Sequence, residues 1–178
     1  MNFLAISGSA RRASTNTALL RGLAEVASPG DAVEVFAGVG DLPVFSPDRE
    51  GDGTPPAVAA FVERIRRADG VIVASPEYVR SIPGGLKNAI DWLVSGDAII
   101  DKPVALLHAS HRGDDMLGAL RIVLVTVTAR FEPDVFARFD LMAKSPEQVR
   151  DALRDPISAA RLSAFLSAFE RAVSRPAG

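Results

Sequence analysis

Short apolar runs alternate along the chain with longer stretches in which apolar residues recur at helical spacing. A short run between polar residues is typical of a buried strand, whereas the helical spacing is typical of an amphipathic helix. The short runs predict five strands, at Asn2–Ser7, Ala32–Phe36, Val71–Ala74, Pro103–His108 and Asp134–Leu141. The longer stretches predict five helices, with inward faces within Leu19–Ala27, Val58–Ile65, Leu86–Leu93, Leu117–Val127 and Leu162–Val173.

Prolines mark the starts of two predicted helices. Thr54 followed by Pro55 is typical of an N-cap residue and a first-turn proline, which predicts the start of the second helix. Pro83 stands where the third helix can begin, and the apolar spacing predicts that this helix runs to Val94. Each proline therefore marks the boundary between a loop and the helix that follows it.

Strand and helix alternate in four or five units within this short chain. Parallel strands need a crossover connection, which a helix supplies, so the alternation favours an α/β fold with helices on both faces of a parallel sheet. No repeat or linker interrupts the pattern, which predicts one domain over residues 1–178. Such sheets bind ligands at the carboxyl ends of their strands. We therefore expect the chemistry in the loops after the first, third and fourth strands.

Composition restricts the chemistry more than the fold. The 178 residues are 48% hydrophobic and include no cysteine, and a chain of this length buries roughly 68–70% of its unfolded surface without disulfides. The lack of cysteine excludes a thiol nucleophile, a CxxC redox pair and thiolate-bound metal clusters. With His108 and His111 as the two histidines, we expect no metal site. Any redox chemistry would therefore belong to a bound cofactor.

Charge and hydropathy disfavour two classes of partner. The 20 Lys and Arg residues against 22 Asp and Glu residues give a formal net charge of −2, so no overall field attracts nucleic acid. No apolar run reaches the roughly 18 residues of a membrane span, and Met1–Ser7 lacks the basic region of a secretory leader. The expectation is a cytoplasmic protein that binds neither nucleic acid nor membrane.

The loop after the first strand has the composition of an anion site. Ser7–Thr17 combines hydroxyl and amide side chains with Arg11 and Arg12. Backbone N–H groups at a helix N-terminus favour a phosphate, and an arginine supplies the counter-charge. The alternative is that Ser14, Thr15 and Asn16 only cap the following helix while the arginines are solvated. The position at the end of the first strand favours the anion site.

Two common phosphate motifs are absent from this loop. There is no G-x-x-x-x-G-K-[ST], which disfavours a nucleotide-hydrolysing P-loop, and no G-x-G-x-x-G of a dinucleotide site. A loop poor in glycine keeps a pyrophosphate from approaching the backbone closely. A phosphate monoester is therefore expected, which leaves mononucleotide cofactors, sugar phosphates and free phosphate open.

The segment after the third strand, Ser75–Trp92, contains the one tyrosine and the one tryptophan of the chain. Its prolines and glycines allow backbone shapes that suit contacts with a planar heterocycle. Tyr78 either stacks on a ring or a partner subunit, or lies half-buried with a wet hydroxyl. Trp92 is assigned to packing or to an interface.

The loop after the fourth strand contains further ionisable candidates. Arg112 either meets the phosphate of a nicotinamide cofactor or is solvated. His111 is the group expected to titrate near neutrality, with a surface position favoured over one beside a cofactor. Asp114 or Asp115 is expected to cap the fourth helix.

Three parts of the chain together resemble a known family. The segments Gly8–Asn16, Ser75–Tyr78 with Pro83–Trp92, and Lys102–Ala105 occur in this order. They are similar to the motifs of the NADPH-dependent FMN reductases, a family that includes bacterial quinone, chromate and azo-dye reductases. The resemblance covers residues 1 to about 130. It implies a flavodoxin-like, doubly wound sheet of five parallel strands in the order 2-1-3-4-5, with helices on both faces.

The resemblance also implies which residues bind FMN. The phosphate is expected at Ser9, Arg11, Ser14, Asn16 and Thr17. The edge of the isoalloxazine ring is expected at Pro76, Glu77, Tyr78 and Val79, and a third ring contact at Ser110 and Gly113. Asn88 and Asp91 belong to the same motifs and are expected to have structural roles at a dimer face.

Two positions depart from the pattern of the family. Family members commonly have asparagine where this chain has Val79, so an amide is replaced by an apolar group while the backbone contacts stay available. This change is expected to alter the flavin potential or the choice of acceptor. After the fourth strand, Asp114, Asp115 and a shorter run to Leu120 replace the usual glycine pair and arginine, which makes the flavin contacts of this loop less secure.

The function implied is that of an FMN-dependent NAD(P)H oxidoreductase. Hydride from NADPH or NADH would pass through bound FMN to a small-molecule acceptor, a quinone, flavin, azo compound or metal oxyanion, in ping-pong order. No side chain is assigned a catalytic role because hydride transfer is the chemistry of the cofactor, although His111 and Glu77 are candidate proton donors. A homodimer or homotetramer is expected.

Two other functions are consistent with the same residues. One is a flavodoxin-type electron carrier without a nicotinamide site of its own. Such carriers dock through strongly acidic faces, so a net charge of −2 with arginines in the site loops disfavours this function. The other is a regulatory or structural domain that has lost the cofactor.

Overall fold

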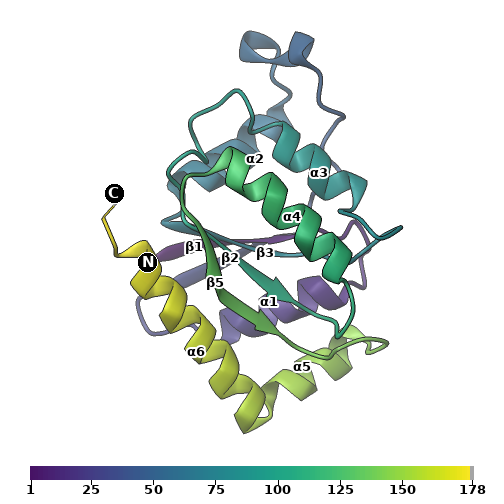
Figure 1. Ribbon diagram of the computed structural model, residues 1–178, viewed down its shortest axis with the longest axis vertical. Helices are drawn as coiled ribbons and strands as arrows, with labels where there is room; N and C mark the ends of the chain where they lie inside the picture. The colour runs from purple at the N-terminus through teal and green to yellow at the C-terminus, as the bar shows by residue number, and fades with distance from the viewer. Residues whose placement is uncertain (177–178) are drawn as a thin grey trace.

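A computed structural model describes residues 1–176, and its centre is a sheet of five parallel strands (Figure 1). The strands are β1 (Asn2–Ser7), β2 (Ala32–Phe36), β3 (Gly70–Ala74), β4 (Val104–His108) and β5 (Phe131–Arg138). They lie in the order β2-β1-β3-β4-β5, and every neighbouring pair is parallel. The α/β class and the predicted strand order are therefore confirmed.

Helices cover both faces of the sheet (Figure 1). One face carries α2 (Pro56–Arg67), α3 (Gly84–Asp91) and α4 (Asp114–Val127), and the other carries α1 (Thr15–Glu25), α5 (Pro146–Arg154) and α6 (Pro156–Val173). Successive residues of β1 alternate between the two cores, so Leu4 packs on one side and Phe3 on the other. The central strands are apolar throughout because both of their faces are covered. None of the described helices is long and apolar enough to cross a membrane, and the cytoplasmic location stays a prediction.

Two 3₁₀ turns, η1 (Pro47–Arg49) and η2 (Gly51–Gly53), form a segment that projects at the top of Figure 1. The end of α3 holds the base of this segment. Asn88 Oδ1 accepts the N–H of Phe45 at 2.8 Å, and the Trp92 indole donates to the carbonyl of Pro43 at 2.8 Å. Trp92 is buried, which confirms its packing role. The dimer-face roles of Asn88 and Asp91 stay predictions.

The last strand differs from its predicted bounds. β5 runs from Phe131 to Arg138 instead of from Asp134 to Leu141. Its pairing with β4 shifts register between Val104 and Leu106, where β5 has extra residues that include Pro133. Proline has no N–H to donate, so it is tolerated at a bulge of an edge strand. Pro133 therefore lies within β5, and the strand begins before it, at Phe131.

Two predicted helix boundaries are also wrong. α3 ends at Asp91, and turns rather than helix continue to Val94. Thr54 is not the N-cap of α2, because Pro55 occupies that position and α2 begins one residue later. The Thr54 hydroxyl instead donates to the carbonyl of Gly51 at 2.8 Å, within the preceding turn.

α5 has no counterpart among the predicted helices. It is mostly polar, and Val149 and Leu153 are its buried residues, so few apolar residues mark its buried face. A capping box begins it: Ser145 Oγ accepts the N–H of Gln148 at 3.3 Å, and Gln148 Oε1 accepts the N–H of Ser145 at 2.8 Å. The Ser-x-x-Gln pattern is the sequence signal that predicts such a start.

Candidate functional site

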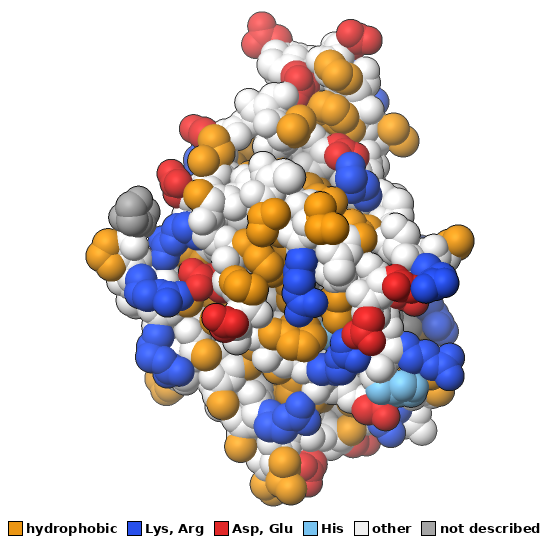
Figure 2. Space-filling view, in the orientation of Figure 1, with side chains coloured by type: hydrophobic (Ala, Val, Ile, Leu, Met, Phe, Trp, Pro, Cys, Tyr) orange, Lys and Arg blue, Asp and Glu red, His pale blue; other side chains and the backbone are white. Residues whose placement is uncertain are grey.

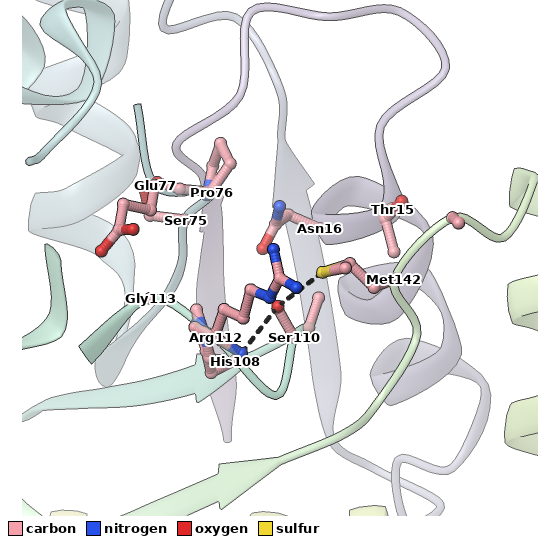
Figure 3. Close-up of a pocket in the computed structure, with 12 residues that line it drawn as sticks. Thr15, Asn16, Ser75, Pro76, Glu77, His108, Ser110, Arg112, Gly113 and Met142 are labelled. Atoms are coloured by element: carbon pink, nitrogen blue, oxygen red, sulfur yellow. Dashed lines mark hydrogen bonds between the residues drawn. The ribbon is translucent and has the colours of Figure 1, made fainter. Parts of the chain in front are cut away.

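The carboxyl ends of β1, β3 and β4 bring three loops together around a pocket of about 280 Å³ (Figure 3). Five of the residues predicted to bind FMN line this pocket: Asn16, Pro76, Glu77, Ser110 and Gly113. The other six lie outside its lining: Ser9, Arg11, Ser14, Thr17, Tyr78 and Val79. The three loops chosen from the sequence are therefore assembled into one site.

The hydroxyl groups of the first loop hold that loop and the start of α1. Ser14 is the N-cap, and its Oγ accepts the N–H of Thr17 at 3.3 Å. Ser9 Oγ accepts the N–H of Arg11 at 3.2 Å, and the Thr17 hydroxyl lies 2.8 Å from that of Ser7. The capping role of Ser14 is confirmed, and the phosphate contacts of this loop stay a prediction.

Asn16 is the side chain of this loop that the protein leaves unsatisfied. It lies in the first turn of α1 and is buried, and its Oδ1 has no hydrogen-bond partner among residues 1–176. Burying an acceptor without a donor costs about 1–3 kcal/mol. Because Asn16 lines the pocket (Figure 3), this atom is suited to a ligand that donates a hydrogen bond.

The second loop ends in a tight hairpin beyond the pocket. Tyr78 and Ser81 exchange two backbone hydrogen bonds, of 3.1 and 3.0 Å. Val79 and Arg80 between them have φ angles of 51° and 57°, as in a type I′ turn. Val79 is fully exposed and Tyr78 is half exposed, and stacking of Tyr78 on a ring or a partner subunit stays a prediction.

Two contacts join the second loop to the start of α4. A Glu77 carboxylate oxygen accepts the N–H of Met116, the third residue of α4, at 3.0 Å. The guanidinium of Arg80 pairs with Asp115 at 2.5 Å. The first N–H groups of a helix have no partner within it, so Glu77 acts as a cap supplied by another loop.

Neither aspartate at the start of α4 is its cap, contrary to the prediction. Gly113 occupies the N-cap position, with a φ of 102° that favours glycine. Asp114 pairs with Arg138 instead, and this pairing lowers the pKa of Asp114. The carboxylates are still placed where the positive end of the helix dipole favours them.

The third loop is a turn that fixes the backbone of Arg112. Ser110 Oγ accepts the N–H of Arg112 at 3.0 Å, and His108 Nε2 lies 2.5 Å from its carbonyl oxygen (Figure 3). A Cβ added at Gly113 would lie 2.8 Å from His108 Nε2. The imidazole thus packs directly beneath Gly113, and the turn needs both residues.

His108 is a buried ionisable group of the site that no sequence motif indicated. A carbonyl oxygen only accepts, so Nε2 carries the proton and donates to Arg112. Nδ1 is buried and has no partner among the described residues. Burial lowers the pKa of His108, which keeps the ring neutral near pH 7.

Residues after β5 complete the rim of the pocket. Met142 and Ala143 line it, and the Ser110 hydroxyl donates to Met142 Sδ at 3.4 Å. They fall in the C-terminal part that carries no recognisable motif, so the sequence offered no signal for them. His111 lies on the surface and pairs with Asp140 at 2.9 Å, which confirms the surface position favoured for it.

The sequence pattern of a known family matches this chain over most of its length. Residues 1–139 match the NADPH-dependent FMN reductases. The chain belongs to this family. The match ends just after β5, so α5 and α6 lie beyond it. This membership confirms the resemblance seen in the three sequence segments. FMN and NAD(P)H are the cofactors of this reductase family.

Curated relatives of this FMN reductase family member share part of their length with it. A quinone reductase of Escherichia coli strain K12 is 39% identical over 113 residues, which cover 62% of this chain and 60% of the relative. An NAD(P)H-dependent FMN reductase of Pseudomonas aeruginosa is 42% identical over 109 residues, which cover 60% of this chain and 58% of the relative. The chain therefore spans about 60% of the length of these curated relatives.

A solved structure resembles the family member over nearly its full length. The flavoenzyme NAD(P)H:(acceptor) oxidoreductase FerB of Paracoccus denitrificans superposes with a TM-score of 0.76 and 26% identity. The superposition covers 97% of this chain and 96% of FerB. The part beyond the family pattern, including α5 and α6, thus also belongs to the shared fold.

Proposed function

We propose that this family member is an FMN-dependent NAD(P)H oxidoreductase that passes electrons to a small-molecule acceptor such as a quinone, a flavin, an azo compound or a metal oxyanion. The observation that carries the proposal is the convergence of three loops on one pocket that contains the unsatisfied Oδ1 of Asn16. The family membership supports the same cofactor.

The chemistry of the residues around the pocket fits FMN. α1 begins at Thr15, and the positive end of its dipole favours a phosphate group beside Ser9, Arg11, Ser14 and Thr17. Asn16 was predicted to contact the phosphate, but its free Oδ1 needs a donor and phosphate oxygens accept, so we assign this atom to the ribityl hydroxyls of FMN. Pro76, Glu77, Tyr78 and Val79 would flank the ring on one side, and Ser110 and Gly113 on the other.

The residues of this chain bind and orient rather than react. Bound FMN would supply the hydride chemistry, accepting electrons from NADPH or NADH and releasing them to the acceptor. Glu77, a candidate proton donor in the sequence, holds the start of α4 in place. With one pocket shared by donor and acceptor, the two substrates would use it in turn, which is a ping-pong order.

The test of the proposed function is an FMN titration of the purified chain, followed by NAD(P)H oxidation with a quinone. We expect tight FMN binding and turnover. Asn16→Ala should weaken FMN binding about tenfold, a loss of about 1.4 kcal/mol, because the ribityl contact is removed. Asn2→Ala, at the opposite end of β1, should bind FMN as the wild type does. Failure of the wild type to bind FMN and to turn over would overturn the proposal.

We further propose that two or more copies of the chain associate through α4. Gly118, Ile122 and Val125 lie along one exposed face of this helix, with Ile122 69% and Val125 59% exposed. Figure 2 shows hydrophobic side chains gathered over α4 on this face. Apolar patches of this kind typically mark interfaces between proteins. Size-exclusion chromatography with light scattering should find a dimer or tetramer that Ile122→Glu dissociates, and a monomeric wild type would contradict this.

A further inference from the structure

The turn after β4 directs one positive charge into the pocket. Both peptide groups of Arg112 are held, by Ser110 on the N–H side and by His108 on the carbonyl side. The Arg112 side chain lines the pocket and extends across it in the direction of Asn16 (Figure 3). These two hydrogen bonds fix the direction in which the Arg112 side chain leaves the backbone, toward the pocket.

Arg112 differs from the neighbouring arginines in having no carboxylate partner. Arg80 pairs with Asp115, and Arg138 pairs with Asp114. Within residues 1–176, no Asp or Glu side chain forms an ion pair with Arg112. Glu77 is the one acidic residue that lines the pocket, and one of its carboxylate oxygens already accepts a hydrogen bond from α4. The positive charge of Arg112 is thus available to a ligand.

Reduction of a flavin creates the charge that such a cation stabilises. Hydride transfer from NAD(P)H moves two electrons and one proton to a neutral oxidised ring, and the nicotinamide becomes the oxidised cation. The reduced ring then carries one negative charge until it takes up a second proton from solvent. A nearby positive charge favours the reduced state over the oxidised state, more strongly where bound ligand excludes water.

The geometry points to Arg112 as the residue that sets the reduction potential of FMN in this pocket, with His108 and Ser110 as its positioning residues. This inference rests on the proposed function, because it needs FMN to occupy the pocket. It goes beyond that function by assigning the charge to Arg112, which is not among the FMN contacts that the family resemblance implies. The altered loop after β4 thereby keeps a role in tuning the cofactor.

The test is the two-electron midpoint potential of bound FMN, measured by equilibration with reference dyes. In Arg112→Gln we expect the equilibrium constant for reduction to fall about tenfold, equivalent to about 30 mV for a two-electron couple. Arg112→Lys keeps the charge and should shift the constant less. Arg21→Gln is the control, because it removes an equal charge from an exposed position of α1 and should leave the potential unchanged.

Sulfite binding gives a second readout that does not depend on turnover. Addition of sulfite to the oxidised ring leaves a negative charge on the ring, and it bleaches the visible absorbance of the flavin. The dissociation constant for sulfite should rise about tenfold in Arg112→Gln, the same free-energy change as the potential shift, and stay unchanged in Arg21→Gln. Equal potentials and equal sulfite affinities in wild type and Arg112→Gln would overturn the inference.

The positioning roles can be tested in combination with Arg112. His108→Ala removes the donor to the Arg112 carbonyl and should lower the potential in the same direction as Arg112→Gln, while His108→Gln can still donate and should restore it. In the double variant with Arg112→Gln, His108→Ala should add no further shift, because His108 acts through Arg112. Additive shifts would overturn the positioning roles. A wild type that binds no FMN would instead overturn the proposed function together with this inference, so the two failures are distinguishable.

Discussion

Val79 and Arg80 hold a backbone conformation that residues with a Cβ rarely adopt. Their φ angles are 51° and 57°, in a two-residue turn whose geometry favours Asn and Gly. The left-handed region costs about 1–2 kcal/mol per ordinary residue, and the Val79 side chain is 99% exposed, so no packing offsets this cost. The asparagine common at this position in the family thus suits the backbone as well as offering an amide.

Replacing the valine should therefore stabilise the chain. We expect Val79→Asn to raise the free energy of unfolding by about 1 kcal/mol, measured by urea denaturation without FMN. Val44→Asn is the matched control, because Val44 is 79% exposed and has no positive φ. It should change stability by less than about 0.5 kcal/mol. Equal effects of the two substitutions would show that the turn stores no strain.

His108 should make stability depend on pH. Burial lowers its pKa in the folded chain, so the unfolded chain binds more protons once the pH falls below the ordinary histidine value of about 6.5. The free energy of unfolding should therefore drop as the pH falls from about 7 to 5, and should not change from this cause above pH 7. Urea denaturation of the wild type and of His108→Gln measures the difference. Parallel pH profiles of the two proteins would contradict this account.

At the scale of elements, the second loop and α4 behave as one unit. Glu77 caps α4 from outside the helix, and the pair of Arg80 with Asp115 lies beside this contact. Because the pocket lies between the second and third loops, loss of the cap would loosen one wall of the site. The cap therefore links helix stability to the shape of the pocket.

The cap can be tested by separating its hydrogen bond from its charge. Glu77→Gln keeps an oxygen acceptor for the Met116 N–H and should cost less than about 0.5 kcal/mol, whereas Glu77→Ala should cost about 1 kcal/mol. Hydrogen exchange of the first turn of α4 should speed up in Glu77→Ala and not in Glu77→Gln. If both variants exchange as the wild type does, Glu77 is not the cap.

Elements marked by several apolar residues could be predicted from the sequence, and those shaped by distant contacts could not. β1 and β2 match their predicted bounds because β1 is a continuous apolar run, β2 alternates apolar residues with Glu34, and a glycine follows each within two residues. α5 was missed because Val149 and Leu153 are its only buried positions. The cap of α4 was misassigned to the adjacent aspartates because Glu77 is 39 residues from Met116 in the sequence. A local sequence pattern contains no information about a hydrogen-bond partner so far away along the chain.

The candidate site likewise has a part that the sequence predicts and a part that depends on the tertiary structure. The three loops were predicted because the carboxyl ends of parallel strands meet at one edge of a sheet. His108 was placed on a strand but not assigned to the pocket, because its contact with Arg112 depends on the shape of the turn. Met142 and Ala143 were missed because they follow β5 without a motif. Residue types identified the loops, and the tertiary structure selected which side chains face the pocket.

At the scale of the whole molecule, the sheet has one hydrophobic core on each face, which leaves the carboxyl ends of its strands free to form a binding site. α2, α3 and α4 cover one face and α1, α5 and α6 the other, so the loops at the carboxyl ends of β1, β3 and β4 are free to form the pocket. We propose that this pocket binds FMN and that the bound FMN accepts hydride from NAD(P)H.

The decisive measurement is anaerobic stopped-flow mixing of the FMN-loaded chain with NADPH, and separately with NADH. We expect that at least one nucleotide bleaches the visible absorbance of the bound flavin within a single turnover, and that a quinone added afterwards restores it. Bound FMN that neither nucleotide reduces would contradict the account and favour an electron carrier, and a chain that retains no FMN would contradict it altogether.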